Sequence, residues 1–268
     1  MVNIRSDAAN SAPAALQVGA ASEFSDWRFA PNIGQHAAVY EIENRALNQA
    51  GHVLAAMRGL ADWAGRTIVD LGCGTGFWLP IYAADAGKVI GIEPDPALRA
   101  AASRRVANLA PRPGPRTPEA SLPTVDMLAG SAEHIPLADC SVDVVHARFA
   151  YFFPPGTDAG LAEVLRVLKP GGRLVAVDND YRWGEFADLL AGSAVNPPLR
   201  TAAITDQWWA DRGATRHEVR SQWQFASRED LAAVLRIEFP AEVADGWLSR
   251  HPVATGLSYG YALFAVTA

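Results

Sequence analysis

The ten residues from Ile68 to Phe77 constrain the fold more than any other part of the chain. Their sequence is IVDLGCGTGF: an apolar β-branched run, one acid, and then three glycines alternating with small residues. An apolar run of this kind is typical of a buried strand. The glycines predict a tight turn after it, because glycine accepts positive φ angles and lets a ligand approach the backbone closely. This turn is therefore expected to form the floor of a ligand site.

Strand and helix patterns alternate along the middle of the chain. This alternation predicts an α/β fold with a doubly wound, mostly parallel sheet that is covered by helices on both faces. Two late strands would add an antiparallel C-terminal edge and bring the sheet to seven strands. The expected strands are 66–70, 88–93, 125–129, 142–147, 173–178, 219–225 and 259–267, and the expected helices after the first strand are 77–86, 96–109, 161–168, 228–237 and 240–248. Gly171 and Gly172 are expected to end the helix 161–168.

The chain length of 268 residues suits one large α/β domain with additions. Residues 1–62 are predicted to form an N-terminal arm and a helical lid, with 1–25 as a loosely docked arm and Trp27 as its anchor or as an aromatic wall. Residues 63–268 are predicted to form the ligand-binding domain, with an insert at about 180–218. The prolines of 111–123 predict an irregular surface loop.

Composition excludes several classes of partner. The net charge is −6 and the isoelectric point is about 5.5, which argues against general attraction to nucleic acid or to anionic membranes. No apolar run approaches the roughly 20 residues of a membrane span, and the N-terminus lacks the pattern of a secretory signal. Two cysteines, Cys73 and Cys140, make no disulfide framework. A cytoplasmic protein is expected.

Two kinds of cofactor bind to a glycine turn that is followed by a second strand ending in an acid. A dinucleotide site needs a third glycine at the position of Phe77, where the helix packs closely and points at a pyrophosphate. Asp70 would repel a pyrophosphate but suits a ligand that carries an ammonium and a sulfonium group. Glu93 is placed to accept hydrogen bonds from a ribose diol in either case.

At this point the sequence resembles the class I S-adenosylmethionine-dependent methyltransferases. The resemblance covers residues 65–180, in order and with familiar spacing. Its motifs are Val69–Gly76, Gly91–Asp95, Ala129–Leu137, Ser141–Arg148 and Val167–Leu174. The family implies S-adenosylmethionine as the cofactor and a Rossmann-like methyltransferase fold.

The resemblance also implies which residues hold the cofactor. Asp70 and the glycine turn would contact the methionine and ribose parts of the cofactor. Glu93 would bind the ribose hydroxyls, and the loop at Ser131 would contact the adenine. Ser131 stands where the family often carries Asp, so Glu133 or the backbone is expected to share that role. The implied cofactor residues are Asp70, Gly72, Cys73, Gly74, Gly76, Glu93, Pro94, Ser131, Ala132, Glu133, Ala147 and Arg148.

Methyl transfer from a sulfonium needs alignment and exclusion of water more than it needs a catalytic group. The candidates for a base are His36 and Tyr40, four residues apart on an expected helix, and His146 near the end of an expected strand. Packing roles are the alternative for each. Residues 178–180 form a polar turn for which a metal role is disfavoured, and no metal is predicted.

Two aromatic groups lie where an acceptor pocket is expected. Residues 151–153 either form an aromatic wall or pack into the core, and Trp208 with Trp209 either cap the pocket or cover an apolar edge. Residues 196–199, Asn-Pro-Pro-Leu, resemble a motif of nucleic-acid amino-methyltransferases, but they follow the fifth strand and lack its final aromatic. They are interpreted as a loop.

The leading hypothesis is a methyltransferase that acts on a small-molecule acceptor at oxygen, nitrogen or carbon. A nicotinamide-dependent oxidoreductase is the second, disfavoured by Phe77 and by the late antiparallel strands. The third is a non-catalytic regulatory protein that binds the cofactor. The acceptor and the oligomeric state are left open by the sequence.

Overall fold

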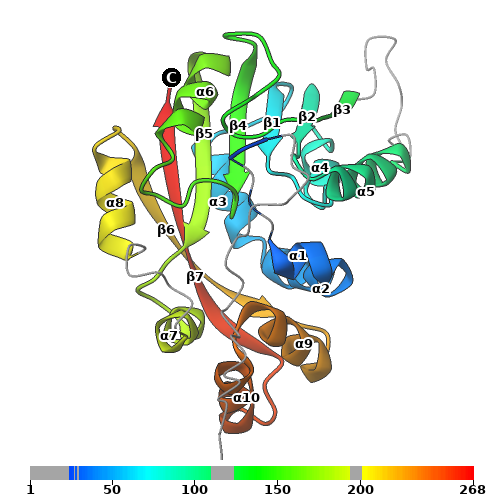
Figure 1. The fold of residues 1–268 in the computed structure, drawn as a ribbon, viewed down its shortest axis with the longest axis vertical. Helices are drawn as coiled ribbons and strands as arrows, with labels where there is room; N and C mark the ends of the chain where they lie inside the picture. Colours follow the sequence, from blue (N-terminus) through cyan, green and yellow to red (C-terminus); the bar gives the residue numbers. More distant parts are fainter. Residues whose placement is uncertain (1–23, 27, 29, 110–123, 194–200) are drawn as a thin grey trace, which may run out of the picture.

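The computed structural model describes residues 24–26, 28, 30–109, 124–193 and 201–268. The strands are β1 (Thr67–Leu71), β2 (Lys88–Ile92), β3 (Thr124–Leu128), β4 (Val142–Arg148), β5 (Leu168–Asn179), β6 (Thr215–Gln224) and β7 (Gly256–Thr267). They form a seven-stranded sheet in the order β3-β2-β1-β4-β5-β7-β6 (Figure 1). The strands β1 to β5 are parallel, and β7 is antiparallel to both of its neighbours. The predicted fold class is confirmed.

Ten helices are described around this sheet. They are α1 (Pro31–Gln35), α2 (Ala37–Asn48), α3 (His52–Leu60), α4 (Leu79–Tyr82), α5 (Pro96–Ala107), α6 (Asp158–Val167), α7 (Glu185–Gly192), α8 (Ala202–Ala210), α9 (Arg228–Glu238) and α10 (Ala241–Arg250). None of these described helices is long and apolar enough to cross a bilayer.

Two predicted helix boundaries are wrong. Only α4 is helical within residues 77–86, because Ala86 already forms a bridge with Ala64 that leads the chain into β2. The helix α6 ends at Val167 rather than at Gly171 and Gly172, because Leu168 is extended and pairs with Val142 of β4. In both places strand pairing begins earlier than the helical pattern suggests.

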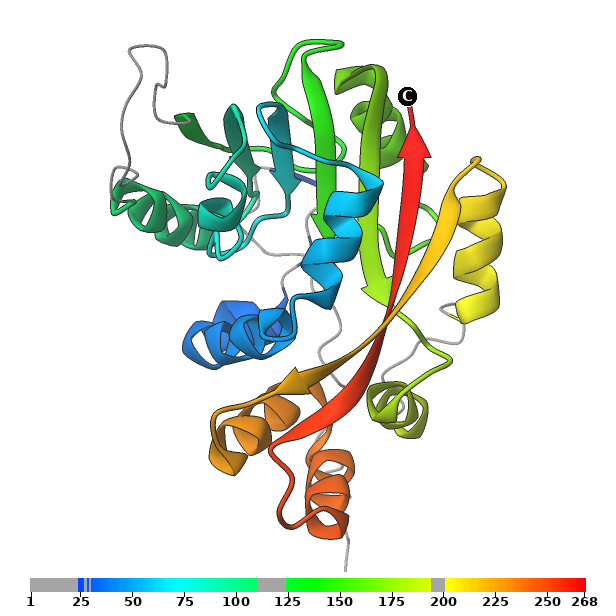
Figure 2. The ribbon, with the colours of Figure 1, turned by 180° about the vertical axis from the view of Figure 1, so that it is seen from behind.

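Helices on both faces of the sheet bury two apolar clusters. Successive residues of β1 point to opposite faces, so Ile68 packs in the cluster that contains Met57 of α3, and Val69 in the cluster that contains Val164 of α6. Figures 1 and 2 show α3 and α6 on opposite faces. The polar strand ends are thereby left at the carboxyl edge of the sheet, where α/β proteins bind ligands.

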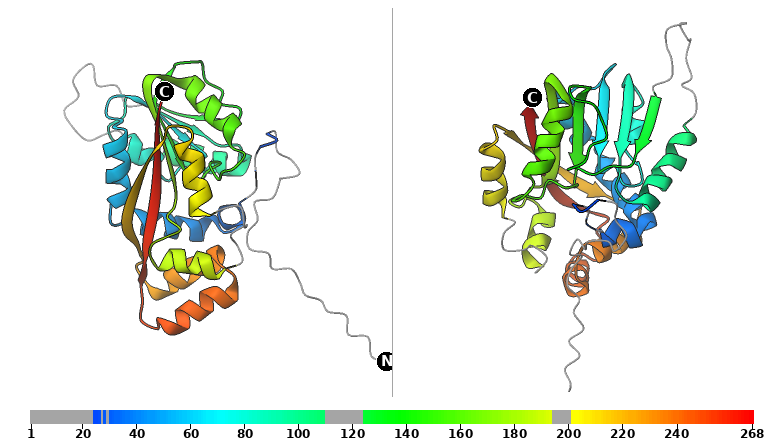
Figure 3. Two further views of the ribbon diagram at one scale, coloured as in Figure 1. Left: turned by 90° about the vertical axis from the view of Figure 1, so that its left-hand side faces the viewer. Right: turned by 45° about the horizontal axis from the view of Figure 1, so that its top comes forward.

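The hairpin of β6 and β7 continues beyond the carboxyl end of β5. Pairing of β5 with β7 stops at Asn179 and Tyr261, whereas β6 and β7 pair as far as Gln224 and Gly256. This extended ribbon carries α9 and α10 (Figure 2), and α9 packs against α2. Figure 3 shows α7, α9 and α10 gathered at one end of the molecule. Residues from both ends of the chain therefore meet beyond the strand ends.

Several predictions concern residues outside the described part of the chain. These are the arm 1–25 except for residues 24 and 25, Trp27, the loop 111–123, and the Asn-Pro-Pro-Leu segment 196–199. The proposed division into an arm with a lid and a domain from residue 63 stays a prediction.

Candidate cofactor and acceptor site

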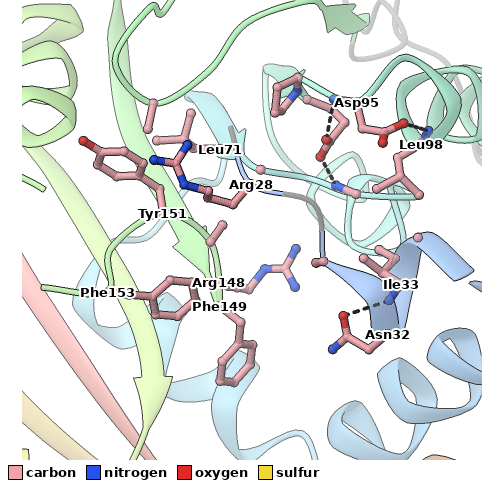
Figure 4. A pocket seen from close by; sticks show the side chains of 18 of the residues that line it. Arg28, Asn32, Ile33, Leu71, Asp95, Leu98, Arg148, Phe149, Tyr151 and Phe153 are labelled. Atoms are coloured by element: carbon pink, nitrogen blue, oxygen red, sulfur yellow. Dashed lines mark hydrogen bonds between the residues drawn. The ribbon is translucent and has the colours of Figure 1, made fainter. Parts of the chain in front are cut away.

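A cavity of about 600 Å³ lies at the carboxyl ends of β1, β2, β4 and β5 (Figure 4). Ligand pockets in proteins commonly measure roughly 300–1,000 Å³. One part, here called the glycine-turn half, is lined by Gly72, Gly74, Glu93 and the segment 130–133. The other part, here called the helix half, is lined by side chains from α2, α7, α9 and β7. Arg148 and Phe149, at the end of β4, also line the cavity.

Gly72 is required by a close contact as well as by its backbone conformation. Its φ is 70°, in the left-handed region. A Cβ atom on Gly72 would lie 2.5 Å from the Cβ of Ala150, in the segment after β4. Any side chain here would push the β4 loop away from the turn. Gly72 therefore allows two walls of the cavity to approach one another.

Glu93 follows β2 and is anchored by two backbone donors. Its Oε2 accepts from the N–H of Gly74 at 2.8 Å, and its Oε1 accepts from the N–H of Asp95 at 2.9 Å. Burial raises the pKa of Glu93 to about 7, although the two N–H groups favour the ionised form. The carboxyl group is held between the glycine turn and the start of α5, with lone pairs left for ligand hydroxyls.

Asp70 reaches the cavity only through Arg148. The Asp70 side chain is fully buried, and its Oδ1 and Oδ2 accept from Arg148 Nη2 at 3.1 and 3.0 Å. The Arg148 Nε donates to the hydroxyl of Tyr82 at 3.2 Å, and the guanidinium lies 4.4 Å from the ring centre of Trp78. Figure 4 shows the guanidinium extending into the cavity. Arg148 is thus a fixed cation that suits a ligand carboxylate.

His146 lies in the core and does not line the cavity. Its Nδ1 is 3.1 Å from the Tyr82 hydroxyl, and its ring packs edge-on against Trp63. Burial lowers the pKa of His146 to about 3, and the charge of Arg148 acts in the same direction. The imidazole is neutral and has no access to an acceptor, so its placement supports the packing alternative.

The predicted pair of His36 and Tyr40 is separated in the structure. His36 precedes α2 as its N-cap residue, with φ −127° and ψ 39°, and its side chain is exposed. Tyr40 is inside α2 and lines the cavity. The expectation of a shared helix face is wrong because the helix begins after His36.

The segment after β3 forms another wall of the glycine-turn half. Ser131, Ala132 and Glu133 line the cavity. The Glu133 Oε1 accepts from the Tyr151 hydroxyl at 2.7 Å, and the Glu133 N–H donates to Asp26 Oδ2 at 3.2 Å. Asp26 and Arg28, which sequence analysis did not single out, bring the N-terminal segment to this wall. They have no motif that marks them.

The aromatic residues after β4 divide between the cavity and the core. Tyr151 and Phe153 line the cavity, whereas Phe152 is buried 5.4 Å from the ring of Trp209. Tyr151 has φ 56°, a left-handed conformation that is uncommon outside glycine and tends to occur at functional sites. Trp209 stacks on Phe264 and does not line the cavity, so the apolar-edge alternative holds for this residue.

The helix half contains functional groups that sequence analysis missed. Glu43 of α2 and Glu238 of α9 line it, and Glu238 Oε1 accepts from Asn32 Nδ2 at 2.7 Å. The ring of Tyr259 stacks on Phe186 with centres 3.9 Å apart. One signal was available: Glu238 stands between Ile237 and Phe239, and a charge within an apolar run is unusual.

The cofactor residues predicted from the motifs therefore fall into two groups. Eight of them line the cavity: Gly72, Gly74, Glu93, Pro94, Ser131, Ala132, Glu133 and Arg148. The other four support it from behind: Asp70, Cys73, Gly76 and Ala147. A Cβ on Gly76, for example, would lie 2.9 Å from the Cβ of Ala102 in α5. Among the described residues, no group of three His, Cys, Asp or Glu side chains is arranged to hold a metal.

Comparison with known proteins identifies the domain around this cavity. The family model described as "Methyltransferase domain" matches residues 69–176, which run from β1 into β5. Over residues 69–176 the chain is thus similar to methyltransferase domains, in agreement with the resemblance drawn from its motifs. The methyltransferase match gives no support to the nicotinamide alternative.

Curated relatives match about half of the chain. The ubiquinone/menaquinone biosynthesis C-methyltransferase of Rubrivivax gelatinosus is 33% identical over 145 residues, which cover 53% of this chain and 52% of the relative. The demethylmenaquinone methyltransferase of Lactococcus lactis is 31% identical over 128 residues, which cover 47% and 46%. The chain thus spans about half the length of these relatives.

Solved structures share the fold at low identity. A SAM-dependent methyltransferase from Aquifex aeolicus has a TM-score of 0.53 and 19% identity, covering 89% of this chain and 98% of its own. The [4+2]-cyclase SpnF has a TM-score of 0.53 and 22% identity, covering 82% and 81%. Since a protein named as a cyclase has this fold, the fold alone does not decide the reaction.

Proposed function

We propose that this protein transfers a methyl group from S-adenosylmethionine to a small-molecule acceptor. The proposal is supported chiefly by the division of the cavity. The glycine-turn half has groups suited to the cofactor, and the helix half extends the same cavity with aromatic and polar side chains. A cofactor bound in the first half would leave the second for an acceptor.

The residues of the glycine-turn half fit the chemical groups of the cofactor. Glu93 offers acceptor lone pairs to the ribose hydroxyls, and the buried guanidinium of Arg148 offers donors to the methionine carboxylate. Ser131 and Glu133 are placed for the adenine edge. The bound cofactor would supply an electrophilic methyl group on a sulfonium.

The chain's own contribution to the reaction is alignment and exclusion of water. Phe149, Tyr151 and Phe153 line the cavity and offer apolar walls that exclude water. Holding the reactants in line is worth several kcal/mol of the barrier. The accepting atom, whether oxygen, nitrogen or carbon, is set by the helix half.

Calorimetric titration with S-adenosylmethionine and with its demethylated product tests cofactor binding. We expect Glu93→Gln to weaken binding by roughly 1.5–3 kcal/mol, because it removes charged hydrogen bonds. The control is Glu229→Gln, an exposed position in the first turn of α9, which should leave the affinity unchanged. Wild-type protein that binds neither compound would contradict the proposal.

Turnover is tested separately with labelled S-adenosylmethionine and a panel of phenols, amines and carboxylates. Incorporation of label into any panel member supports an enzyme. Binding of the cofactor without incorporation into any acceptor would favour the non-catalytic alternative. Saturable binding of a reduced nicotinamide cofactor would favour the oxidoreductase.

A further inference from the structure

Glu43 and Glu238 meet across the helix half from opposite ends of the chain. Their carboxyl groups hydrogen bond to each other, and Asn32 Nδ2 donates to Glu238 Oε1 at 2.7 Å. Two carboxyl groups can form such a bond only when one of them holds a proton. Burial and the neighbouring Glu238 raise the pKa of Glu43 well above its ordinary value. Burial also raises the pKa of Glu238, but its hydrogen bonds with Asn32 and Glu43 act in the opposite direction, so Glu43 is the carboxyl group that holds the shared proton and Glu238 the one that carries the negative charge.

This charge has no cation beside it among the described residues. Neither carboxylate takes part in a described ion pair, and no described donor reaches Glu43 Oε2. Arg148 influences Tyr40 but is itself committed to Asp70. The groups that face the pair are Tyr40 from α2, Asn32 from α1, and Tyr259 and Tyr261 from β7. They bring hydroxyls and an amide but no positive charge.

An enclosed negative charge without a counter-ion costs several kcal/mol. A ligand that brings a cation to this place would recover that cost. The surroundings suit one, because Tyr40, Phe149 and Tyr181 line the same cavity. Aromatic faces attract ammonium groups. Carboxylate and aromatic groups together describe a site for a protonated amine.

We propose that Glu43 and Glu238 select an acceptor with a basic nitrogen, so that the methyl group is transferred to an amine. This inference rests on the proposed methyl transfer and names its substrate class. The ammonium group binds to the carboxyl pair and passes one proton to it. The freed lone pair of nitrogen forms the N–C bond while the C–S bond breaks, and the bonding electrons stay on sulfur. The product is a methylated ammonium and a neutral thioether.

The curated relatives do not decide this question. The family match covers residues 69–176, and both Glu43 and Glu238 lie outside it. A neutral phenol or quinol would bind without a positive charge and would leave the carboxyl pair uncompensated. The charge of the site therefore favours an amine over the acceptors that the relatives' names suggest.

Matched amines and alcohols test the inference in the full-length protein saturated with demethylated cofactor. The probes are benzylamine, 2-phenylethylamine and cyclohexylamine, each with the corresponding alcohol, and binding is measured calorimetrically at pH 7. We expect at least one amine to bind at least about tenfold more tightly than its alcohol. Glu43→Gln and Glu238→Gln should each remove this preference, while Glu229→Gln on the same helix as Glu238 should keep it.

Affinity for the demethylated cofactor serves as the folding control, and it should change less than about twofold in all three variants. Alcohols that bind as tightly as amines, or amines that bind equally well to the glutamine variants, would overturn the inference. So would preferential binding of a reduced naphthoquinone over every amine. In those cases the proposed methyl transfer stands if the cofactor still binds, whereas loss of cofactor binding in the wild type contradicts that proposal instead.

Discussion

In the glycine-turn half of the cavity, the charged side chains of Glu93 and Arg148 stand at strand ends and are held in place by hydrogen bonds within the protein. Glu93 is held by two backbone N–H groups, and Arg148 is paired with Asp70. In the helix half, Glu43 and Glu238 come from distant parts of the chain and share an uncompensated charge. The side chains of the first half are already held in place by the protein, whereas the carboxyl pair of the second half would be stabilised by a bound cationic ligand.

The largest effect is expected from breaking the buried pair in the glycine-turn half. Arg148→Met should lower the free energy of unfolding by about 3–5 kcal/mol, because it leaves the buried Asp70 without a partner. Chemical denaturation measures the change. The double variant Asp70→Asn with Arg148→Met removes both charges and should recover part of the loss. A single variant as stable as the wild type would show that the pair is not a structural element of this half.

The next largest effect tests how much the close contact between Gly72 and Ala150 contributes to stability. Gly72→Ala should cost about 2–4 kcal/mol of stability, from left-handed strain and from the contact with Ala150. Gly213→Ala is the matched control, since its φ is 73° but no atom lies within 4 Å of the added Cβ. It should cost only about 1–2 kcal/mol. Equal losses in the two variants would mean that the contact with Ala150 has no energetic weight.

The smallest effect tests the helix half, where we expect a mutation to stabilise. The pKa of Glu43 is raised by burial and by Glu238, so its contribution to stability is fully present below pH 4.5 and is lost as the pH rises through the folded-state pKa. Glu43→Gln removes that loss and should be more stable than the wild type by about 1 kcal/mol at alkaline pH. Unfolding measured from pH 5 to pH 9 checks this. If the free energy of unfolding changed with pH in the same way for the wild type and the variant, the raised pKa of Glu43 would be contradicted.

The same contrast explains which parts of the molecule were predictable from sequence. The turn at Gly72 and the acid at Glu93 belong to short local patterns, and the alternation of strands and helices predicts the mostly parallel sheet. The spacing of His36 and Tyr40 predicted that both residues lie on one helix face. This was wrong because α2 begins only after His36, and Tyr40 alone lines the cavity. His146 was ambiguous because a histidine near a strand end can point to either face, and here it points into the core.

The helix half was beyond local patterns for a physical reason. Glu43 and Glu238 are brought together by the ribbon of β6 and β7 and by the packing of α9 on α2. Neither residue has a neighbour in sequence that signals the other. Contacts between distant segments depend on tertiary packing, and a single sequence contains no direct record of them.

The part of the β6–β7 hairpin that extends beyond β5 has a consequence for how such a protein can evolve. This part does not pair with the parallel strands. Substitutions in α9 can therefore change one wall of the helix half while the glycine-turn half keeps its shape. A new preference for an acceptor can then arise from changes in the segment between β6 and β7, without changes in the residues proposed to bind the methyl donor.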